Sequence, residues 1–164
     1  MTGFDDLLSA NRAYADSFDT PDLPGAAGAG VLVVTCMDSR IDPLALLGLG
    51  LGDAKIVRNP GGRVTDTAME AVVLGVNLLG ATRVLVVPHT RCAVASNSEA
   101  ALREKLGEAT GADVSWLTLP VTDGQDAALA ADVARVRSHP LVPDSVTVGG
   151  FVYDVDTGLL DQKY

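Results

Sequence analysis

The chain has 164 residues, of which 48% are hydrophobic and only 4% aromatic, and it carries a formal net charge of −9. This length fits one domain, so we treat residues 1–164 as a single unit with a core of aliphatic side chains. The twelve Lys and Arg residues are scattered. The chain therefore lacks the basic patch of a nucleic-acid binder.

The longest apolar run, residues 25–34, is about half the ~20 residues that a membrane-spanning helix needs. The N-terminus is acidic, whereas a secretory signal would be basic. We therefore expect no membrane partner and a cytoplasmic location. In a reducing compartment, the two cysteines are better candidates for a metal site or a reactive site than for a disulfide.

The first half of the chain predicts two helices and two buried strands. Residues 4–18 place apolar side chains at roughly helical spacing, and the Pro- and Gly-rich residues 21–30 predict a connector. Residues 31–35 (VLVVT) and 54–57 (AKIV) are short apolar runs typical of strands buried on both faces. Residues 65–79 predict a helix, with Thr at its start as the cap and Gly just beyond its end.

The second half continues this alternation. Residues 83–88 (RVLVVP) predict a third buried strand, and a helix is expected to start at residue 96 or 97 and to end near residue 107. A further helix is predicted over residues 123–137, with Asp123 at its N-cap. For Trp116, the only tryptophan, we expect a place in the core.

Residues 145–155 alternate partly between apolar and polar side chains and lead into a DTG turn, which indicates a strand and a short hairpin. Strands that alternate with helices predict an α/β fold. We therefore expect a mostly parallel central β-sheet flanked by helices, with an N-terminal helix and a C-terminal strand and hairpin.

Chemically reactive side chains follow two of the predicted strands. The first strand is followed by Cys36-Met37-Asp38-Ser39-Arg40, and RVLVV is followed by Pro88-His89-Thr90-Arg91-Cys92. Active sites of α/β folds lie at the carboxyl ends of strands. If these two strands are neighbours, about 4.8 Å apart, both thiols and His89 can converge. Two thiolates and one imidazole make a zinc shell with the open fourth position of a catalytic site.

The fourth position falls to water or to the nearby carboxylate of Asp38. Arg40, two residues later, can face the same side and clamp that carboxylate through two hydrogen bonds. A clamped Asp38 would stay ionised and could orient a water toward a substrate. Three plainer interpretations stay open: Cys36 and Cys92 as small buried hydrophobes, an ordinary surface ion pair, and a thiol redox pair.

Together, Cys-x-Asp-x-Arg and His-x-x-Cys resemble the signature of the β-class carbonic anhydrases, in particular the small bacterial type. The resemblance continues in Arg58-Asn59-Pro60-Gly61, in the long helix that follows, and in residues 150–154 and 157–158, so it covers residue 31 to the C-terminus. The Gly-rich residues 60–63 lack the spacing of a phosphate-binding loop, and we expect their backbone to pass close to the site.

The resemblance implies that Cys36, His89 and Cys92 bind Zn²⁺, that Asp38 and Arg40 form a catalytic dyad, and that Asp38 can also ligate the metal in a resting form. The implied activity is reversible hydration of carbon dioxide to bicarbonate and a proton, by attack of zinc-bound hydroxide. The implied assembly is a homodimer or a dimer of dimers, with residues 1–30 packing on a partner subunit.

Two residues depart from the family pattern, which often has Asp at the position of Arg91 and usually Gly at that of Ala93. Arg91 places a positive charge beside the site, and Ala93 could block a left-handed backbone conformation. Neither residue is a ligand. The alternatives are therefore a zinc-binding relative that senses bicarbonate or redox state, and a hydrolase of carbon disulfide or carbonyl sulfide on the same site.

Overall fold

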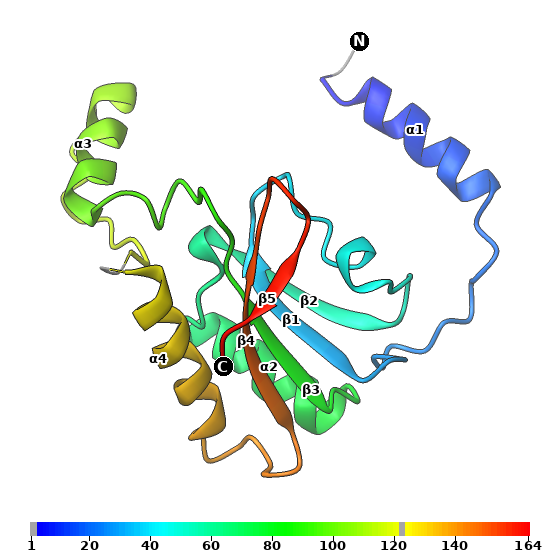
Figure 1. The fold of residues 1–164 in the computed structure, drawn as a ribbon. Helices are drawn as coiled ribbons and strands as arrows, with labels where there is room; N and C mark the ends of the chain where they lie inside the picture. Colours follow the sequence, from blue (N-terminus) through cyan, green and yellow to red (C-terminus); the bar gives the residue numbers. More distant parts are fainter. Residues whose placement is uncertain (1–2, 122–123) are drawn as a thin grey trace.

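A sheet of five strands in the order β2-β1-β3-β4-β5 forms the centre of the computed structural model, which describes residues 3–121 and 124–164 (Figure 1). The first four strands in chain order are parallel, and the last pairs antiparallel with β4. This arrangement confirms the predicted α/β fold with a C-terminal hairpin. The strands are β1 (Val31–Cys36), β2 (Ala54–Asn59), β3 (Arg83–Val87), β4 (Thr147–Tyr153) and β5 (Leu160–Gln162).

Strand β1 lies in the interior of the sheet, between β2 and β3, and all six of its residues are buried. Burial on both faces explains why its sequence is a continuous apolar run rather than an alternating one. Its one hydroxyl, on Thr35, donates to the carbonyl oxygen of Val87 at 2.7 Å. Since Thr35 also lies opposite Val87 in the parallel register, β1 and β3 end side by side at one edge of the sheet.

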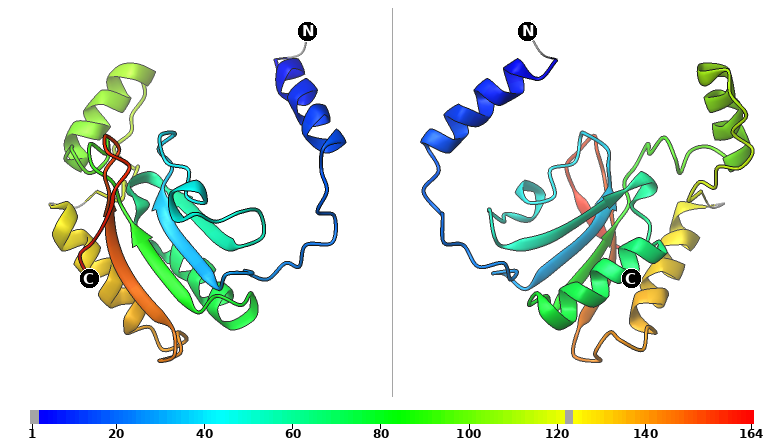
Figure 2. Two further views of the ribbon diagram at one scale, coloured as in Figure 1. Left: turned by 45° about the vertical axis from the view of Figure 1, so that its right-hand side comes forward. Right: turned by 180° about the vertical axis from the view of Figure 1, so that it is seen from behind.

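Helices α2 (Asp66–Leu78) and α4 (Gln125–Arg137) cover one face of the sheet (Figure 2). Their apolar side chains form one core with alternate residues of β1 and β3. The Thr65 hydroxyl accepts the backbone N–H of Ala68, so the predicted cap of α2 is confirmed. Gly80 follows the end of the helix with φ +76, the left-handed conformation that glycine adopts without strain.

The boundaries of the other predicted helices differ from the expectation at one or both ends. Helix α3 (Glu99–Thr110) begins after Ser98, whose side chain accepts the N–H of Ala101, and not at residue 96 or 97. Residues 93–97 form turns after Cys92 instead, and α3 continues past residue 107 to the left-handed Gly111. The expected cap at Asp123 lies outside the described residues.

Helix α1 (Asp5–Asp16) forms as predicted but stands away from the sheet, and none of its residues is buried (Figures 1 and 2). The prediction of a core position for Trp116 is wrong. This side chain is 75% exposed, and its indole N–H donates to the Asp113 carbonyl in the segment after α3, away from the aliphatic core. Among the described residues, no helix combines the length and the apolar character needed to cross a membrane.

Candidate metal centre

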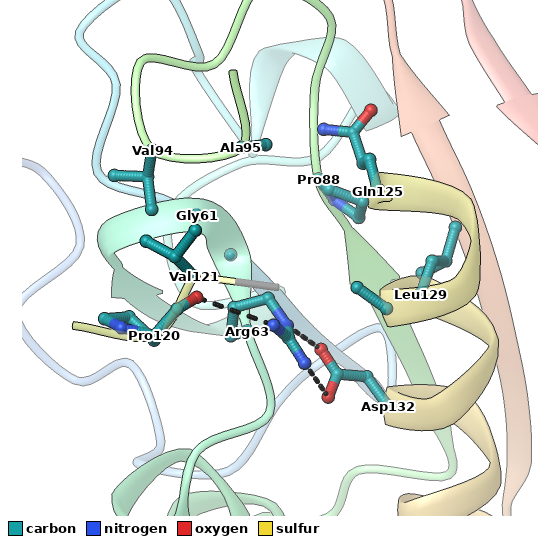
Figure 3. A pocket seen from close by; sticks show the side chains of 12 residues that line it. Gly61, Arg63, Pro88, Val94, Ala95, Pro120, Val121, Gln125, Leu129 and Asp132 are labelled. Atoms are coloured by element: carbon teal, nitrogen blue, oxygen red, sulfur yellow. Dashed lines mark hydrogen bonds and ion pairs between the residues drawn. The ribbon is translucent and has the colours of Figure 1, made fainter. Parts of the chain in front are cut away.

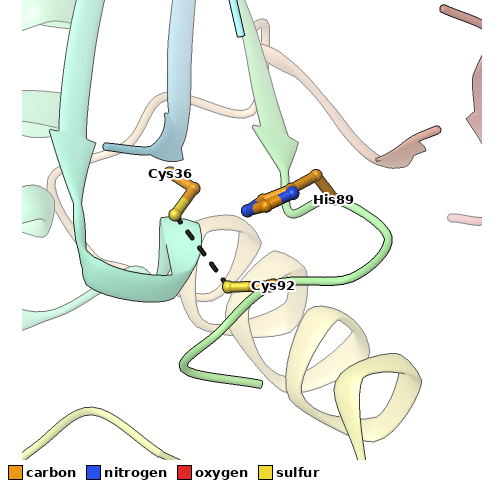
Figure 4. A group of neighbouring side chains, drawn as sticks. All are labelled: Cys36, His89 and Cys92. Atoms are coloured by element: carbon orange, nitrogen blue, oxygen red, sulfur yellow. Dashed lines mark hydrogen bonds between the residues drawn. The ribbon is translucent and has the colours of Figure 1, made fainter. Parts of the chain in front are cut away.

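Two cysteines and a histidine meet at the carboxyl ends of β1 and β3 (Figure 4). Cys36 is the last residue of β1, and His89 and Cys92 lie on the loop that follows β3. The two sulfur atoms are 4.0 Å apart, and the potential ligand atoms of the three residues all lie within 4.8 Å of one another. All three side chains are buried. The parallel register of neighbouring strands thus brings together residues that are 56 positions apart.

The His89 ring is oriented for a metal. Its Nδ1 lies 2.9 Å from the carbonyl oxygen of Thr90, which can only accept, so we assign the ring proton to Nδ1 and a lone pair to Nε2. Within the described part of the chain, Nε2 is buried without a hydrogen-bond partner. An unpaired buried nitrogen is costly unless something outside the chain satisfies it.

The donor set fits a zinc ion. Tetrahedral zinc with sulfur ligands at about 2.3 Å places two sulfurs about 3.8 Å apart, close to the 4.0 Å between Cys36 and Cys92. A disulfide needs the two sulfurs at about 2.05 Å, and both thiols are free. Two soft thiolates and an imidazole nitrogen are ligands that zinc prefers, and three of them leave one position open.

The two thiols differ in their readiness to ionise. Burial by itself would raise the pKa of Cys36, but nearby hydrogen-bond donors, among them the backbone N–H groups of Asp38 and Gly61, outweigh it and lower the pKa to about 7. Burial also raises the pKa of Cys92, and there it prevails over the lowering contribution of the neighbouring backbone N–H groups. Cys36 is therefore the thiol prepared to be a thiolate near neutral pH.

The Gly-rich residues 60–63 lie against Cys36, as the sequence predicted. Gly62 has φ +66, and a Cβ atom on it would come within 2.9 Å of the Cys36 backbone nitrogen. Asn59, at the end of β2, braces this turn, because its side chain accepts from Arg63 N–H and donates to the Arg63 carbonyl at 2.8 and 2.7 Å. At position 62, only glycine combines the left-handed conformation with so close an approach to the Cys36 backbone.

Asp38 and Arg40 form the expected clamp beside the three ligands. Arg40 Nε and Nη2 donate to the two carboxylate oxygens at 2.8 and 2.7 Å, and its backbone N–H donates at 3.0 Å. These hydrogen bonds hold the pKa of Asp38 well below its usual range. Asp38 Oδ2 lies 3.7 Å from His89 Nε2, so the carboxylate is next to the metal position but is turned toward Arg40.

Two residues that support the site had no role assigned from the sequence. Arg58 donates to the carbonyls of Cys36 and Asp38 at 2.9 and 2.6 Å, and Gln125 of α4 donates to the carbonyl of His89 at 2.8 Å. Arg58 belongs to the Arg58-Asn59-Pro60-Gly61 stretch that resembles the family, and this resemblance could have indicated a role at the site. No local pattern distinguishes Gln125, because its contact depends on how α4 packs.

The two departures from the family pattern are accommodated in different ways. Arg91 takes the left-handed conformation, with φ +53, and its side chain pairs with Asp156 at the surface. Among the described residues it is the only non-glycine with positive φ, so Ala93 is not strained in this way. The Arg91 carbonyl accepts from Arg40 Nη2 at 3.3 Å. The positive charge of Arg91 therefore lies at the rim of the site, beside an acid.

Comparison with known proteins gives concordant matches. A family model described as carbonic anhydrase matches residues 31–131. The chain is 30% identical to β-carbonic anhydrase 1 of Mycobacterium tuberculosis over 162 residues, which covers 99% of this chain and 98% of that protein. It is 32% identical to a carbon disulfide hydrolase of Acidithiobacillus thiooxidans, covering 76% and 68% respectively. Among solved structures, a carbonic anhydrase from Streptococcus mutans has a TM-score of 0.89 at 36% identity, covering 99% of this chain and 98% of that one.

Proposed function

Because this chain belongs to the β-carbonic anhydrase family, we propose that it catalyses the reversible hydration of carbon dioxide to bicarbonate and a proton. Its cofactor would be a zinc ion held by Cys36, His89 and Cys92. The observation that carries the proposal is the buried Nε2 of His89, which has no hydrogen-bond partner among the described residues, beside two free thiols that are 4.0 Å apart. Three ligands with an open fourth position suit catalysis rather than a closed structural site.

Zinc bound there would act as a Lewis acid and lower the pKa of a coordinated water to about 7. The chain's own contribution is orientation. Asp38 is ionised at neutral pH and can only accept hydrogen bonds, and its Oδ2 is 3.7 Å from His89 Nε2. It can therefore accept from a water beside the metal position and direct that water's lone pair toward the substrate. Arg40 keeps the carboxylate from turning onto the metal itself.

Arg58 keeps the carboxylate and the Cys36 ligand in fixed relation. It donates to the backbone carbonyls of both Cys36, the last residue of β1, and Asp38, two residues later on the loop that follows. A shift of this loop would move Cys36 and the Asp38 carboxylate together. We assign Arg58 a positioning role, since it reaches the reacting atoms only through these two residues.

The test combines metal analysis with stopped-flow hydration of carbon dioxide at alkaline pH. We expect about one zinc per chain and rapid hydration, in keeping with a single catalytic site. His89→Asn should lose the metal, whereas His139→Asn is the matched control because the Nδ1 of His139 accepts the N–H of Leu141 at an exposed turn. A fully zinc-loaded protein that does not hydrate carbon dioxide would identify a non-catalytic relative and contradict the proposal.

A second candidate activity is hydrolysis of carbon disulfide or carbonyl sulfide at the same three ligands. The observation in its favour is the 32% identity to proteins named carbon disulfide hydrolases. Both reactions take a small linear substrate to the same ligands, so a direct comparison is needed. Sulfide release from either compound that exceeds hydration of carbon dioxide on the same preparation would replace the first proposal with the second.

We also propose that residues 1–164 act as one domain, in the cytoplasm, as a homodimer or a dimer of dimers. The free thiols suit a reducing compartment. Helix α1 leaves apolar side chains uncovered, including Phe4 at 68% and Leu7 at 61% exposure, which a partner subunit would cover. Light scattering on the eluting protein tests the assembly, and a monomer at micromolar concentration would contradict it.

A further inference from the structure

Helix α4 contacts the candidate metal centre through two polar residues on one face. Gln125 and Asp132 are seven positions apart, about two helical turns, so they lie on the same side of the helix. Their neighbours on that side, Ala128 and Leu129, are buried, and Asp132 itself is only 4% exposed. Figure 3 shows Gln125 and Asp132 pointing from α4 toward the segments that carry Pro88 and Arg63. The proposed reaction uses neither residue.

Gln125 holds the histidine loop. Strand β3 ends at Val87, so His89 lies beyond the regular ladder, with one isolated bridge to Tyr153. The Gln125 amide donates to the His89 carbonyl at 2.8 Å. The ring of His89 is held separately by the Thr90 carbonyl. Backbone and ring of this ligand are thus fixed from two directions, and α4 supplies one of them.

Asp132 holds the glycine turn that lies against the other ligand. Its two carboxylate oxygens accept from Arg63 Nε at 2.6 Å and Nη2 at 3.1 Å, and one of them also accepts the Val64 N–H at 3.2 Å. Arg63 directly follows Gly62, whose backbone touches Cys36. The ion pair therefore fixes the position of the turn that packs on Cys36.

An ion pair of this kind is weak evidence of a net contribution to fold stability. Apolar residues of similar volume often replace a buried pair without loss of stability, because desolvation offsets the attraction between the charges. Packing between α4 and the loops is also incomplete. A cavity of about 20 Å³, room for roughly one water, lies between them and is lined partly by Gly61, Pro88 and Val94. Directional polar contacts therefore join α4 to both loops in addition to the apolar packing of Leu129 in the core.

We propose that Gln125 and Asp132 are positioning residues of the metal centre. Helix α4 is a rigid spacer, and its two contacts set the loop of His89 and the turn against Cys36 at a fixed separation. This inference rests on the zinc site of the proposed function but not on the identity of the substrate. Partners that hydrogen-bond the ligating side chains commonly contribute about 10–100-fold to metal affinity, and we expect the same order for these contacts to the backbone that carries the ligands.

The test compares Gln125→Met and Asp132→Asn with two matched controls in the full-length protein. Gln162→Met makes the same change at an exposed amide that donates to the Tyr164 carbonyl, and Asp126→Asn makes it on the exposed side of α4. Zinc affinity is measured by competition with a chelator, and ligand geometry by the absorption bands of the cobalt-substituted protein. We expect each site variant to bind zinc about 10–100-fold more weakly with altered cobalt bands, and both controls to be unchanged.

Circular dichroism and thermal unfolding of the zinc-free proteins separate positioning from misfolding. Asp132→Asn removes the carboxylate charge that pairs with the half-buried Arg63 and can destabilise the fold. Gln125→Met keeps the ion pair and the core, so it provides the independent check. Unchanged zinc affinity and cobalt bands in a folded Gln125→Met protein would overturn the inference while leaving the proposed function intact. Failure of the unaltered protein to bind zinc would overturn both.

Discussion

Replacement of Gly62 by alanine tests how strongly the metal centre depends on one close backbone contact. A Cβ atom on Gly62 would lie 2.9 Å from the Cys36 nitrogen, closer than real Cβ atoms come to other atoms, and 3.0 Å from the Thr35 carbonyl carbon, which is also unusually tight. Both neighbours are backbone atoms of β1, which is buried throughout, and they cannot rotate aside as a side chain would. The glycine turn must therefore move away from Cys36.

The size of the effect follows from two contributions. The left-handed conformation of Gly62, with φ +66, costs alanine about 1–2 kcal/mol, and overpacking adds about 1–3 kcal/mol. We therefore expect Gly62→Ala to lower the free energy of unfolding by about 2–5 kcal/mol. Gly48 and Gly111 have φ +65 and +68, but a Cβ atom at either meets nothing within 4 Å. Gly48→Ala and Gly111→Ala should thus show the first contribution alone.

The assay is urea unfolding of the three zinc-free variants, followed by zinc titration against a chelator. We expect the Gly62 variant to unfold at the lowest urea concentration. We also expect it to bind zinc at least about tenfold more weakly. If moving Cys36 from its position costs even about 1.4 kcal/mol of zinc-binding free energy, the affinity falls by a factor of ten. The two control variants should keep the zinc affinity of the unaltered protein. A Gly62→Ala protein as stable as Gly48→Ala, with unaltered zinc affinity, would refute the reasoning.

Three further predictions concern the ionisable groups. Arg40→Met should still bind zinc but hydrate carbon dioxide more slowly in stopped-flow assays, because Asp38 loses two charge-assisted hydrogen bonds of 2.8 and 2.7 Å; undiminished hydration would exclude the dyad. Since Arg40 lowers the pKa of Asp38, the stability that this carboxylate adds is present above its unfolded pKa of about 3.9 and is lost as the pH falls further. The difference in melting temperature between the zinc-free protein and Asp38→Asn should therefore shrink from about pH 5 downward, and a constant difference would contradict this. In the zinc-free protein, ultraviolet absorbance should show one thiolate forming with a pKa of about 7 and a second forming at higher pH; Cys36→Ser should remove the first, and a remaining transition near neutrality would reassign it to Cys92.

Strand β1 could be predicted because burial on both faces requires a continuous apolar run, whereas β2, predicted to be buried in the same way, is an edge strand and only partly buried. Residues 31–35 contain no charged side chain, and the structure buries every one of them. The start of α2 could also be predicted, since the Thr65 hydroxyl makes the cap that its residue type suggests. The exposure of Trp116 could not be predicted. A large aromatic side chain is buried only where its segment reaches the core, and the segment that carries Trp116 lies away from the core.

The three potential ligands could be predicted because each follows a strand directly or within a few residues, and parallel strands end at a common edge. Asp132 and Gln125 could not, because their contacts join α4 to loops more than 30 positions away in sequence. One signal was available in retrospect. Asp132 stands on the face of a helix that otherwise presents Leu129, Val133 and Val136 to the core. A charged residue on such a face is rarely buried without a partner.

In the proposed zinc site, the balance of charge gives Arg40 a role in addition to that of the ligands. Two thiolates already neutralise a divalent cation, so a third anion at the same point would only take the open position. Asp38 lies close enough to do so, with Oδ2 3.7 Å from His89 Nε2. Arg40 donates to both oxygens, which under the proposed function would hold the carboxylate away from the metal, and Arg40 also donates to the Arg91 carbonyl at 3.3 Å. Because Arg91 lies between His89 and Cys92, the loop that supplies two of the proposed ligands would also govern whether the fourth position stays open.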